Sequence, residues 1–489
     1  MSGMRIAIVG GGIAGLAAAF EIEKARTENP GIHYTLYESR PRLGGSLASE
    51  VVDGAVLEEG PDSFLTEKPA AADLCRELGL ESELLPSNDA ARKTCIVVHN
   101  RLVPLPDGLM FLVPTRLAAT AFTPLFSVAT KLRMTVELFH PPRLGHADDE
   151  SVAALVERHY GAEAVDRLAD PLLSGIYGGS AAQLSAGVVL PRLVEMETRF
   201  GSLTRGMLAA HRKMQSRPKG PSQSPNGGAA APRSIFTALR GGMSQLVGAL
   251  VARLDPGSLR LNTSVASVER AASGWKLEAA DASEPYDGLI VATPAWSAAQ
   301  FLASVDAALV DELAAIPYSS SITVNLIYDE SRLGRLPQGF GFLVPASEGR
   351  AMLACTFAHR KFLGRTPPGK AVFRAFLGGV HREAQLAEPD ARLIATVRRE
   401  LTEILGPRTL PPALEPEQAR VARWPRAMAQ YAVGHRQRID RIAARVSDLP
   451  GLRLAGNAYD GIGIPDCIRL GRQAARDLIA PTTQPAPSP

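Results

Sequence analysis

Cysteine is scarce in this sequence. The four cysteines stand apart in the chain, at positions 75, 95, 355 and 467. There is no Cys-x-x-Cys pair, and the nine histidines show no ligand spacing. These absences argue against a structural zinc site, a dithiol redox centre or another metal site. Isolated thiols are typical of a reducing cytosol, so we expect a cytoplasmic protein that binds no metal.

Long hydrophobic runs are also missing. No uncharged apolar run reaches the roughly 20 residues that a membrane-spanning helix needs. The longest candidate, residues 117–130, lies between Arg116 and Lys131 and is interrupted by Pro124. Residues 109–139 as a whole alternate apolar stretches with basic residues. This pattern favours helices that lie in a membrane interface, although a buried pair of helices explains it equally well.

The chain has no excess of charge of one sign, because 53 basic residues face 50 acidic ones. No basic stripe alternates with aromatic residues, so we expect no nucleic-acid partner. No Gly-x-Ser-x-Gly elbow and no phosphate-loop lysine motif occurs, which excludes the common serine-hydrolase and phosphate-loop patterns. A length of 489 residues predicts two or three domains.

The first motif is a glycine-rich turn in "IAIVGGGIAGLAAAFE", residues 6–21. An apolar strand leads into Gly10, Gly12 and Gly15, which allow a tight turn, close approach of a pyrophosphate and close helix packing, respectively. The following helix would point its N-terminus at the phosphates. A second strand ends at Glu38, where an acid fits ribose hydroxyls and disfavours NADP. The alternative is an ordinary strand-turn-helix with an exposed glutamate.

Three further glycine-rich stretches identify the dinucleotide. They are "ESRPRLGGS" at 38–46, "EEGPDSFL" at 58–65 and "LAGNAYDGIGIP" at 454–465. The last stretch predicts a second strand-to-helix turn, whose N–H groups could face the electron-rich end of an isoalloxazine ring. A nicotinamide dehydrogenase needs none of these parts. Each stretch alone is also compatible with a plain loop, but their combination and order favour a flavin.

The remaining pattern predicts the following elements. We expect an amphipathic helix in 68–85 that ends at Gly79, several helices in 96–212, of which one is capped by Asp149, and a loop at 217–234. A hairpin in 259–279 should turn at Ser273-Gly274, and a strand should end before Pro294. Further strands in 318–380, a helix at 390–406 and a final strand-turn-helix should follow.

These stretches carry a family resemblance. The run from Gly10 to Ser46 resembles the flavin-dependent amine oxidase and protoporphyrinogen oxidase superfamily. Within that superfamily, residues 58–65, 170–186, 339–353 and 455–475 resemble the bacterial oxygen-dependent porphyrinogen oxidases, which act on protoporphyrinogen IX or coproporphyrinogen III. The resemblance covers nearly the whole chain.

The resemblance implies an α/β + α fold. It has a discontinuous Rossmann-type FAD domain of the p-hydroxybenzoate-hydroxylase type, a mixed-sheet substrate domain and a helical, membrane-associating domain. The implied boundaries are 1–90, 235–300 and 416–480 for the FAD domain, 91–212 for the helical domain, 213–234 for a flexible linker, 301–415 for the substrate domain and 481–489 for a disordered tail.

The resemblance also implies site residues. The pyrophosphate would be held by Gly10, Gly11, Gly12, Ile13, Ala14 and Gly15, with Arg42 nearby, and the adenosine by Glu38, Ser39 and the backbone of Val265. The flavin would be lined by Gly45, Ser46, Gly60, Pro61, Asp62, Ser63, Trp424, Asn457, Ile462, Gly463 and Ile464. For the substrate we expect Lys68 as a propionate partner and Ile176 as an apolar wall, against the alternatives of a surface lysine and a core isoleucine.

Two positions depart from the pattern of the resemblance. Many superfamily members carry Gly-Asp where this chain has Gly456-Asn457. Animal relatives carry a basic residue where this chain has Asp62, so their propionate contacts cannot be carried over.

The implied activity is the six-electron oxidation of a porphyrinogen to a porphyrin in haem biosynthesis, with FAD as cofactor, dioxygen as acceptor and hydrogen peroxide as product. No catalytic acid–base pair is expected, because the cofactor carries the chemistry. A flavin amine oxidase or carotenoid-desaturase-like enzyme and a non-catalytic FAD-binding scaffold are the alternatives. A ferrochelatase partner, a homodimer and contact with the inner face of the cell membrane are further expectations, and the choice of porphyrinogen stays open.

Overall fold

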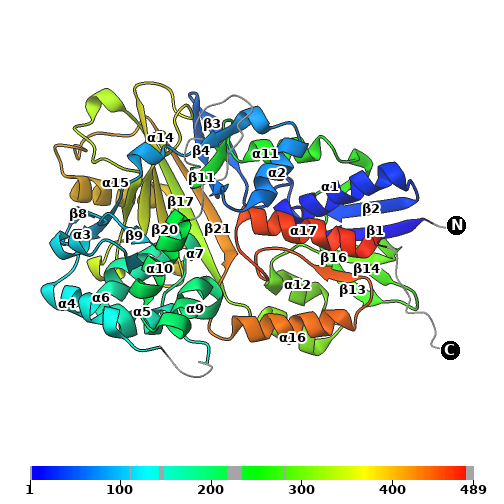
Figure 1. Cartoon of the computed structure of the whole chain (residues 1–489). Helices are drawn as coiled ribbons and strands as arrows, with labels where there is room; N and C mark the ends of the chain where they lie inside the picture. The colour runs from blue at the N-terminus through cyan, green and yellow to red at the C-terminus, as the bar shows by residue number, and fades with distance from the viewer. Residues whose placement is uncertain (1–2, 111, 143–147, 217–233, 280–281, 481–489) are drawn as a thin grey trace.

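The computed structural model describes residues 3–110, 112–142, 148–216, 234–279 and 282–480. It has two lobes, one built on a parallel sheet and the other on a larger mixed sheet flanked by helices (Figure 1). Residues 217–233 of the expected linker and the expected tail at 481–489 lie outside the described residues.

The first lobe is built on a five-stranded parallel sheet with the order β12-β2-β1-β16-β22. Its strands are β1 (Met4–Val9), β2 (Ile32–Tyr37), β12 (Leu259–Arg260), β16 (Gly288–Val291) and β22 (Leu452–Leu454). The sheet therefore joins an N-terminal, a middle and a C-terminal part of the chain, as expected for a discontinuous Rossmann-type domain. The predicted strand-turn-helix is confirmed, because β1 leads into α1 (Ile13–Glu28).

The alternation of side chains along β1 builds two cores. Ile6 and Ile8 pack with α1, α11 (Ser244–Val251) and α17 (Ile464–Ile479) on one face. Ala7 and Val9 pack on the other face with β14 (Trp275–Ala279), α12 (Ala295–Phe301) and α13 (Ala307–Ala314). The α1 and α17 helices approach closely, since a Cβ on Gly471 would lie 2.0 Å from the carbonyl oxygen of Ala14.

The predicted hairpin is confirmed on that second face. β13 (Val265–Arg270) pairs with β14 (Trp275–Ala279), and β14 pairs with β15 (Ala282–Tyr286), all antiparallel. Gly274 turns the hairpin with a φ of 80°, which L-residues with a side chain rarely adopt. The neighbouring helices are α12 (Ala295–Phe301), α13 (Ala307–Ala314) and α16 (His435–Ser447).

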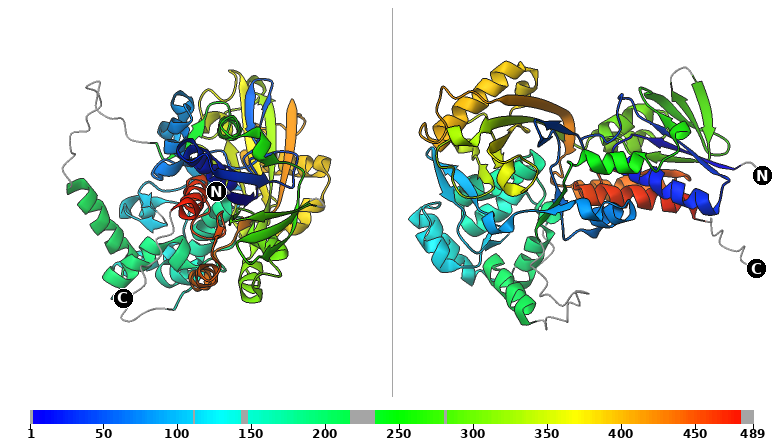
Figure 2. Two further views of the ribbon diagram at one scale, coloured as in Figure 1. Left: turned by 90° about the vertical axis from the view of Figure 1, so that its right-hand side faces the viewer. Right: turned by 90° about the horizontal axis from the view of Figure 1, so that it is seen from above.

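The second lobe is built on a seven-stranded sheet with the order β21-β17-β20-β19-β18-β7-β8. The strands are β7 (Thr94–Val98), β8 (Arg101–Pro104), β17 (Tyr318–Asp329), β18 (Gly341–Leu343), β19 (Ala354–Phe357), β20 (Lys370–Gly378) and β21 (Gln418–Ala429). The helix predicted at 390–406 is confirmed as α15 (Asp390–Leu405), which covers the outer face of this sheet (Figure 2).

Part of the region expected to be helical is β-structure instead. The hairpin β7-β8 joins the large sheet through β18, and β9 (Leu109–Met110) pairs with β10 (Val113–Pro114). The run "TCIVV" of β7 is rich in β-branched residues, and His99 and Asn100 turn the hairpin at positive φ. These are strand and turn signals that helical periodicity does not override.

The helices follow after this β-structure. They are α3 (Leu117–Phe122), α4 (Val128–Val136), α5 (Val152–Tyr160), α6 (Ala162–Ala164), α7 (Asp170–Tyr177), α8 (Ala186–Val189), α9 (Pro191–Phe200) and α10 (Leu203–Ser216). The expectation that Asp149 caps a helix is wrong. Ser151 caps α5 by accepting from the Ala154 N–H, while Asp149 accepts from Ser185 Oγ and the Gly434 N–H. Among the described residues, no helix is both long and apolar enough to cross a membrane.

Short elements connect the two lobes. They are β3 (Ser49–Val52), β4 (Ala55–Glu58), β5 (Phe64–Leu65), α2 (Pro69–Glu77), β6 (Leu84–Pro86), β11 (Phe236–Leu239) and α14 (Ala358–Lys361). The helix predicted in 68–85 is confirmed as α2, and Gly79 has a φ of 77° just beyond its end.

Candidate cofactor and substrate site

The turn after β1 has the geometry of a phosphate-binding turn. Gly10 adopts a φ of 108° and donates its N–H to the Tyr37 carbonyl at 2.8 Å. A Cβ on Gly15 would lie 1.9 Å from the Gly10 carbonyl oxygen, so only glycine fits there. A Cβ on Gly12 would meet no protein atom within 4 Å. The backbone at Gly12 is therefore open on the side where a ligand would approach the N-terminus of α1.

Glu38 lies beside this turn, as the sequence predicts. Its carboxylate accepts hydrogen bonds from the Gly11 N–H at 2.8 Å and the Arg40 N–H at 2.9 Å. Its carbonyl accepts from the Thr263 N–H at 2.9 Å, and Val265 begins β13 two residues later. The residues predicted to hold an adenosine thus come together at one edge of the parallel sheet.

The second glycine pair packs directly on the first turn. The Gly44 N–H donates to the Gly11 carbonyl at 2.8 Å, and a Cβ on Gly45 would lie 3.2 Å from the Cα of Gly12. Arg42 donates to the Gly45 carbonyl at 2.7 Å. Its guanidinium therefore stabilises its own loop beside the predicted phosphate position.

Residues 58–63 continue this surface toward the large sheet. A Cβ on Gly60 would lie 1.8 Å from the Ser46 carbonyl oxygen, so the two segments touch through their backbones. The indole N–H of Trp424 donates to the Glu59 carbonyl at 2.8 Å, and the Arg42 guanidinium lies 5.8 Å from the Trp424 ring centre. The structure thus brings together the residues predicted to line a flavin from the N-terminal part of the chain and from β21.

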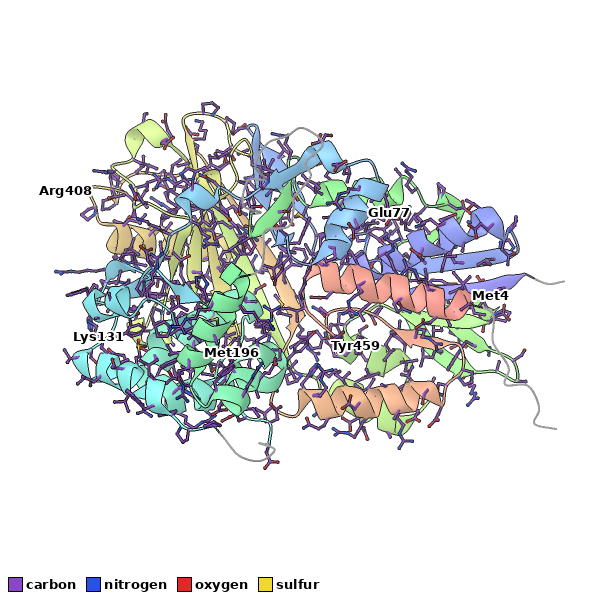
Figure 3. All side chains as sticks on the ribbon, in the orientation of Figure 1. Met4, Glu77, Lys131, Met196, Arg408 and Tyr459 are labelled. Atoms are coloured by element: carbon purple, nitrogen blue, oxygen red, sulfur yellow. The ribbon has the colours of Figure 1, made fainter. Side chains whose placement is uncertain are left out.

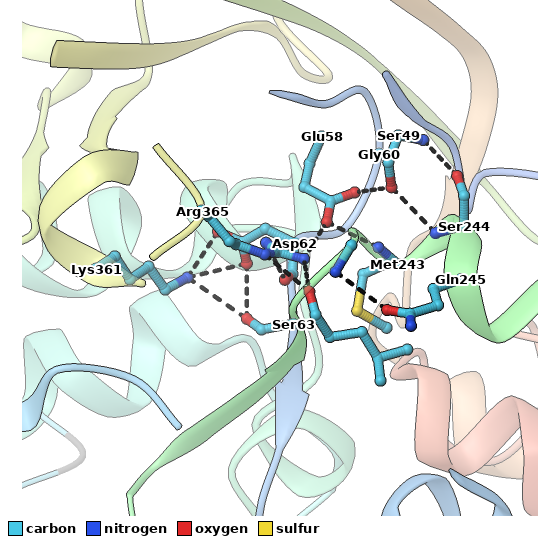
Figure 4. A network of polar contacts seen from close by, with 12 residues as sticks. Ser49, Glu58, Gly60, Asp62, Ser63, Met243, Ser244, Gln245, Lys361 and Arg365 are labelled. Atoms are coloured by element: carbon cyan, nitrogen blue, oxygen red, sulfur yellow. Dashed lines mark hydrogen bonds and ion pairs between the residues drawn. The ribbon is translucent and has the colours of Figure 1, made fainter. Parts of the chain in front are cut away.

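Asp62 is the centre of a buried ionic cluster. Lys361 Nζ lies 2.9 Å from both carboxylate oxygens of Asp62, and an Arg374 nitrogen lies 3.4 Å away. Burial alone would raise the pKa of the Asp62 carboxyl, but these two cations hold it well below its usual range. Figure 4 shows Lys361 pointing toward Asp62 and Ser63, while Arg365 reaches Glu58 at 2.6 Å.

Sequence reasoning missed the three cations of this cluster. Lys361, Arg365 and Arg374 lie about 300 positions from the loop that they bind, and no local motif marks them. An acid in a loop expected to line a flavin, such as Asp62, needs a cationic partner once it is largely removed from water, and this need is a signal that could have prompted a search.

The C-terminal turn forms the far side of the site. Asn457 donates its side-chain amide to the Ala427 carbonyl at 2.9 Å. The Tyr431 hydroxyl donates to the Asn457 carbonyl at 3.0 Å and accepts from the Gly461 N–H at 2.9 Å. Gly463 then caps α17, whose first residue is Ile464. Asn457 and the N-terminus of α17 are thereby held next to β21, and Tyr459 lies in the middle of the molecule (Figure 3).

Lys68 is bound to this same helix terminus. Its Nζ lies 2.7 and 2.9 Å from the carboxylate oxygens of Asp466 in the first turn of α17. Lys68 is therefore not a freely solvated surface lysine.

Ile176 lies on the exposed side of α7, with 57% of its surface accessible despite its apolar side chain. The end of α7 is fixed because the Tyr177 carbonyl accepts from Gln430 Nε2 at 2.7 Å and from Ser319 Oγ at 3.0 Å. The Tyr177 ring centre lies 6.2 Å from that of Tyr431. Burial and the charge of Asp466 raise the pKa of Tyr177 to about 12. The segment that carries Ile176 thus lies beside the C-terminal turn.

Comparison with known families decides the identity of the cofactor. Residues 13–479 match the family of flavin containing amine oxidoreductases. The chain belongs to this family. A flavin held by a dinucleotide-binding turn is FAD, and the open backbone at Gly12 and the N-terminus of α1, which no side chain caps, fit it. Among the described residues, no group of three or more His, Cys, Asp or Glu side chains could hold a metal ion.

Members of this family with named activities match the chain over nearly its full length. The coproporphyrinogen III oxidase of Bacillus subtilis is 33% identical, with 97% of each chain covered. The coproporphyrinogen III oxidase of Staphylococcus aureus is 31% identical, with 97% of this chain and 99% of the relative covered. A crystal structure provisionally described as a protoporphyrinogen oxidase, from Exiguobacterium sp. 255-15, superimposes with a TM-score of 0.84 at 32% identity and covers 98% and 99% of the two chains.

Proposed function

We propose that this flavoenzyme oxidises a porphyrinogen to the corresponding porphyrin in haem biosynthesis, with dioxygen as the electron acceptor and coproporphyrinogen III as the preferred substrate. The full-length similarity to two coproporphyrinogen III oxidases supports this proposal. The structural observation that carries it is the exposed side chain of Ile176. The hydrogen bond from Gln430 to the Tyr177 carbonyl holds this part of α7 beside the C-terminal turn. An accessible apolar side chain there suits a flat, apolar macrocycle.

We assign the cofactor contacts to the residues that the fold brings together. The pyrophosphate would lie on the turn at 10–15 and the ribose against Glu38 and Ser39, with the adenine beside Val265. The flavin would lie between the backbone of 45–46 and 60–63, Trp424, and the C-terminal turn formed by Asn457, Ile462, Gly463 and Ile464.

Held by these residues, FAD would supply two-electron oxidation: in each cycle the macrocycle would give up a hydride from a meso carbon and a proton, and dioxygen would be reduced to hydrogen peroxide. Conversion of a porphyrinogen to a porphyrin removes six electrons and six protons, so three such cycles consume three molecules of dioxygen. The residues of the chain bind and orient the macrocycle and exclude water, and no acid–base pair is assigned. Ile176 would form an apolar wall, and Lys68 would contact a propionate from its position beside Asp466.

A fluorescence assay tests the proposal directly. FAD-loaded protein is mixed in air with coproporphyrinogen III or protoporphyrinogen IX, and the initial rate of porphyrin formation is followed. We expect the faster rate with coproporphyrinogen III. A faster rate with protoporphyrinogen IX would reverse the substrate assignment, and activity with amines alone would overturn the proposed function.

We further propose that α4 contacts a membrane peripherally, on its cytoplasmic face. Val128, Leu132 and Val136 follow each other at helical spacing and are all exposed, and Lys131 and Arg133 flank them. An apolar stripe with basic neighbours suits an anionic lipid surface. Figure 3 shows Lys131 on this outer helix, at the edge of the molecule.

Flotation on anionic liposomes tests this contact. We expect the wild-type protein to float with the liposomes and the Leu132→Glu variant to stay at the bottom of the gradient. Leu363→Glu is a matched control. Leu363 is 58% exposed, against 62% for Leu132, and it lies outside α4, between α14 and β20. Wild-type protein that stays at the bottom of the gradient would refute the membrane contact.

Transfer of the product to a ferrochelatase and formation of a homodimer extend this proposal. A conjugated porphyrin is sparingly soluble and sensitises damage by light, so direct transfer would protect the cell. Light scattering of the purified protein, alone and with a ferrochelatase, tests both expectations, and a monomer that does not bind the second enzyme would refute them.

A further inference from the structure

Three neighbouring strands of the large sheet each send one side chain to residues 58–60, the short segment that leads from β4 into the flavin-lining loop. Asn325 of β17 donates its amide to the Glu58 carbonyl at 3.0 Å. Trp424 of β21 donates its indole N–H to the Glu59 carbonyl at 2.8 Å. Arg374 of β20 donates to the Gly60 carbonyl. Three successive carbonyls are thus bound by three side chains of the large sheet.

The sheet register explains how these donors come together. The strands are adjacent in the order β21-β17-β20. Asn325 lies directly opposite Arg374, and Trp424 lies opposite Ser321, four residues before Asn325. Opposed residues and residues separated by an even number of positions share one face of a sheet, so all three side chains project toward the 58–60 segment.

The loss of any of these hydrogen bonds should be costly, because the donor side chains are buried. Asn325, Arg374 and Trp424 are all buried, so a carbonyl that loses its donor cannot be satisfied easily by bulk water. The segment also has no room to retreat, because Gly60 already touches the Ser46 backbone. The ion pair of Arg374 with Asp62 holds the same segment two residues further along.

We propose that Asn325, Arg374 and Trp424 are positioning residues through which the substrate-side sheet sets the conformation of the flavin-lining segment, and with it the affinity for FAD and the electronic environment of the flavin. The FAD-binding lobe is therefore incomplete without the large sheet. This inference rests on FAD as the cofactor and does not depend on the identity of the porphyrinogen.

The first experiment compares two identical substitutions. Trp424→Phe removes the donor to the Glu59 carbonyl and keeps an aromatic ring. Trp275→Phe is the matched control, because Trp275 is also buried and its indole N–H has no hydrogen-bond partner. Apoprotein of each variant is titrated with FAD, and the visible absorption bands of the loaded protein are recorded. We expect FAD to bind about tenfold more weakly to Trp424→Phe, with shifted flavin bands, and almost unchanged to Trp275→Phe.

A second variant separates positioning from direct contact with the flavin. Asn325→Leu preserves the side-chain volume and removes only the bond to the Glu58 carbonyl, since the Asn325 oxygen has no partner. It should weaken FAD binding and shift the flavin bands in the same direction as Trp424→Phe, in apoprotein whose circular dichroism matches the wild type.

Equal FAD affinity and equal spectra for wild type, Trp424→Phe and Asn325→Leu would overturn the inference. Because neither readout involves a porphyrinogen, this outcome would leave the proposed oxidase activity untouched. Conversely, a protein inactive with every porphyrinogen could still show the expected FAD effects.

Discussion

The ammonium of Lys68 lies 2.7 Å from a carboxylate oxygen of Asp466, which stands 398 positions further along the chain. This ion pair joins the residue before α2 to the first turn of α17. Lys68 is half-exposed, so the pair by itself stabilises the fold by at most about 1 kcal/mol. Its position beside the flavin turn matters more than its energy, because the same ammonium is the proposed partner of a substrate propionate.

Lys68→Met and Asp466→Asn separate these two roles. Both variants break the ion pair, so both should lower the melting temperature slightly. Only Lys68→Met also removes the cation, and it should raise KM for coproporphyrinogen III about tenfold, the value for one lost charged hydrogen bond. Steady-state kinetics of both variants measure this difference. Equal KM values would show that Lys68 serves only the ion pair.

Gln430 should affect substrate binding without touching the substrate. Its amide holds the Tyr177 carbonyl at the end of α7, beside Ile176. Gln430→Met preserves the length of the side chain and removes one of the two donors to that carbonyl, since Ser319 Oγ still donates to it. We expect KM to rise several-fold, as for Ile176→Ala, with FAD content unchanged. Gln418→Met, at a partly exposed position of β21, is the control. An unchanged KM for Gln430→Met would contradict the assignment of the α7 terminus to the substrate site.

The buried His159 should make the stability of the helical region depend on pH. Burial would lower its pKa, but hydrogen bonds to Glu137 at 3.0 Å and Glu197 at 3.1 Å outweigh burial and raise it. The same contacts lower the pKa of both glutamates. Arg158, bonded to Glu197, and the His140 ring, 5.2 Å away, also face this group.

A raised histidine pKa stabilises the fold fully below the unfolded value, about 6.5, and the stabilisation is lost as pH rises through the folded pKa. The lowered glutamate pKa values add stability that is lost as pH falls below about 4.3. Urea unfolding should therefore show stability falling as pH rises above about 6.5, and His159→Gln should remove that slope. A wild-type slope that persists in His159→Gln would disprove the assignment.

The local parts of the site could be predicted from the sequence, because their geometry depends on neighbouring residues. Gly10, Gly12 and Gly15 determine one turn, and Glu38 follows on the next strand, so their proximity is a consequence of a single strand-helix-strand unit. The second glycine pair at 44–45 then packs on the same turn.

The long-range parts could not be predicted. Lys361 and Arg374 reach Asp62 only because β20 and α14 are placed beside the flavin-lining segment by the register of a seven-stranded sheet. No local sequence pattern around a single lysine or arginine indicates such a distant partner. Asp149 illustrates the same limit. Its position three residues before an apolar run predicts a helix cap, but its carboxylate binds Ser185 and Gly434 instead.

Two alanine substitutions in the first turn distinguish a residue that shapes the fold from one that faces the cofactor. A methyl group on Gly15 would lie 1.9 Å from the Gly10 carbonyl oxygen, so α1 must move and Gly15→Ala should destabilise the apoprotein by several kcal/mol. Gly12 has an ordinary φ of −70°, and its methyl group would meet no protein atom within 4 Å. Gly12→Ala apoprotein should therefore melt at the wild-type temperature.

Its FAD binding should nevertheless be lost, because the added methyl group occupies the side of the turn on which the pyrophosphate must approach the backbone N–H groups. Calorimetric melting of the apoproteins and titration with FAD measure the two effects separately. If Gly12→Ala bound FAD like the wild type, the pyrophosphate could not lie against this face of the turn. The open space at Gly12 is thus the part of the structure that most directly reports where the cofactor binds.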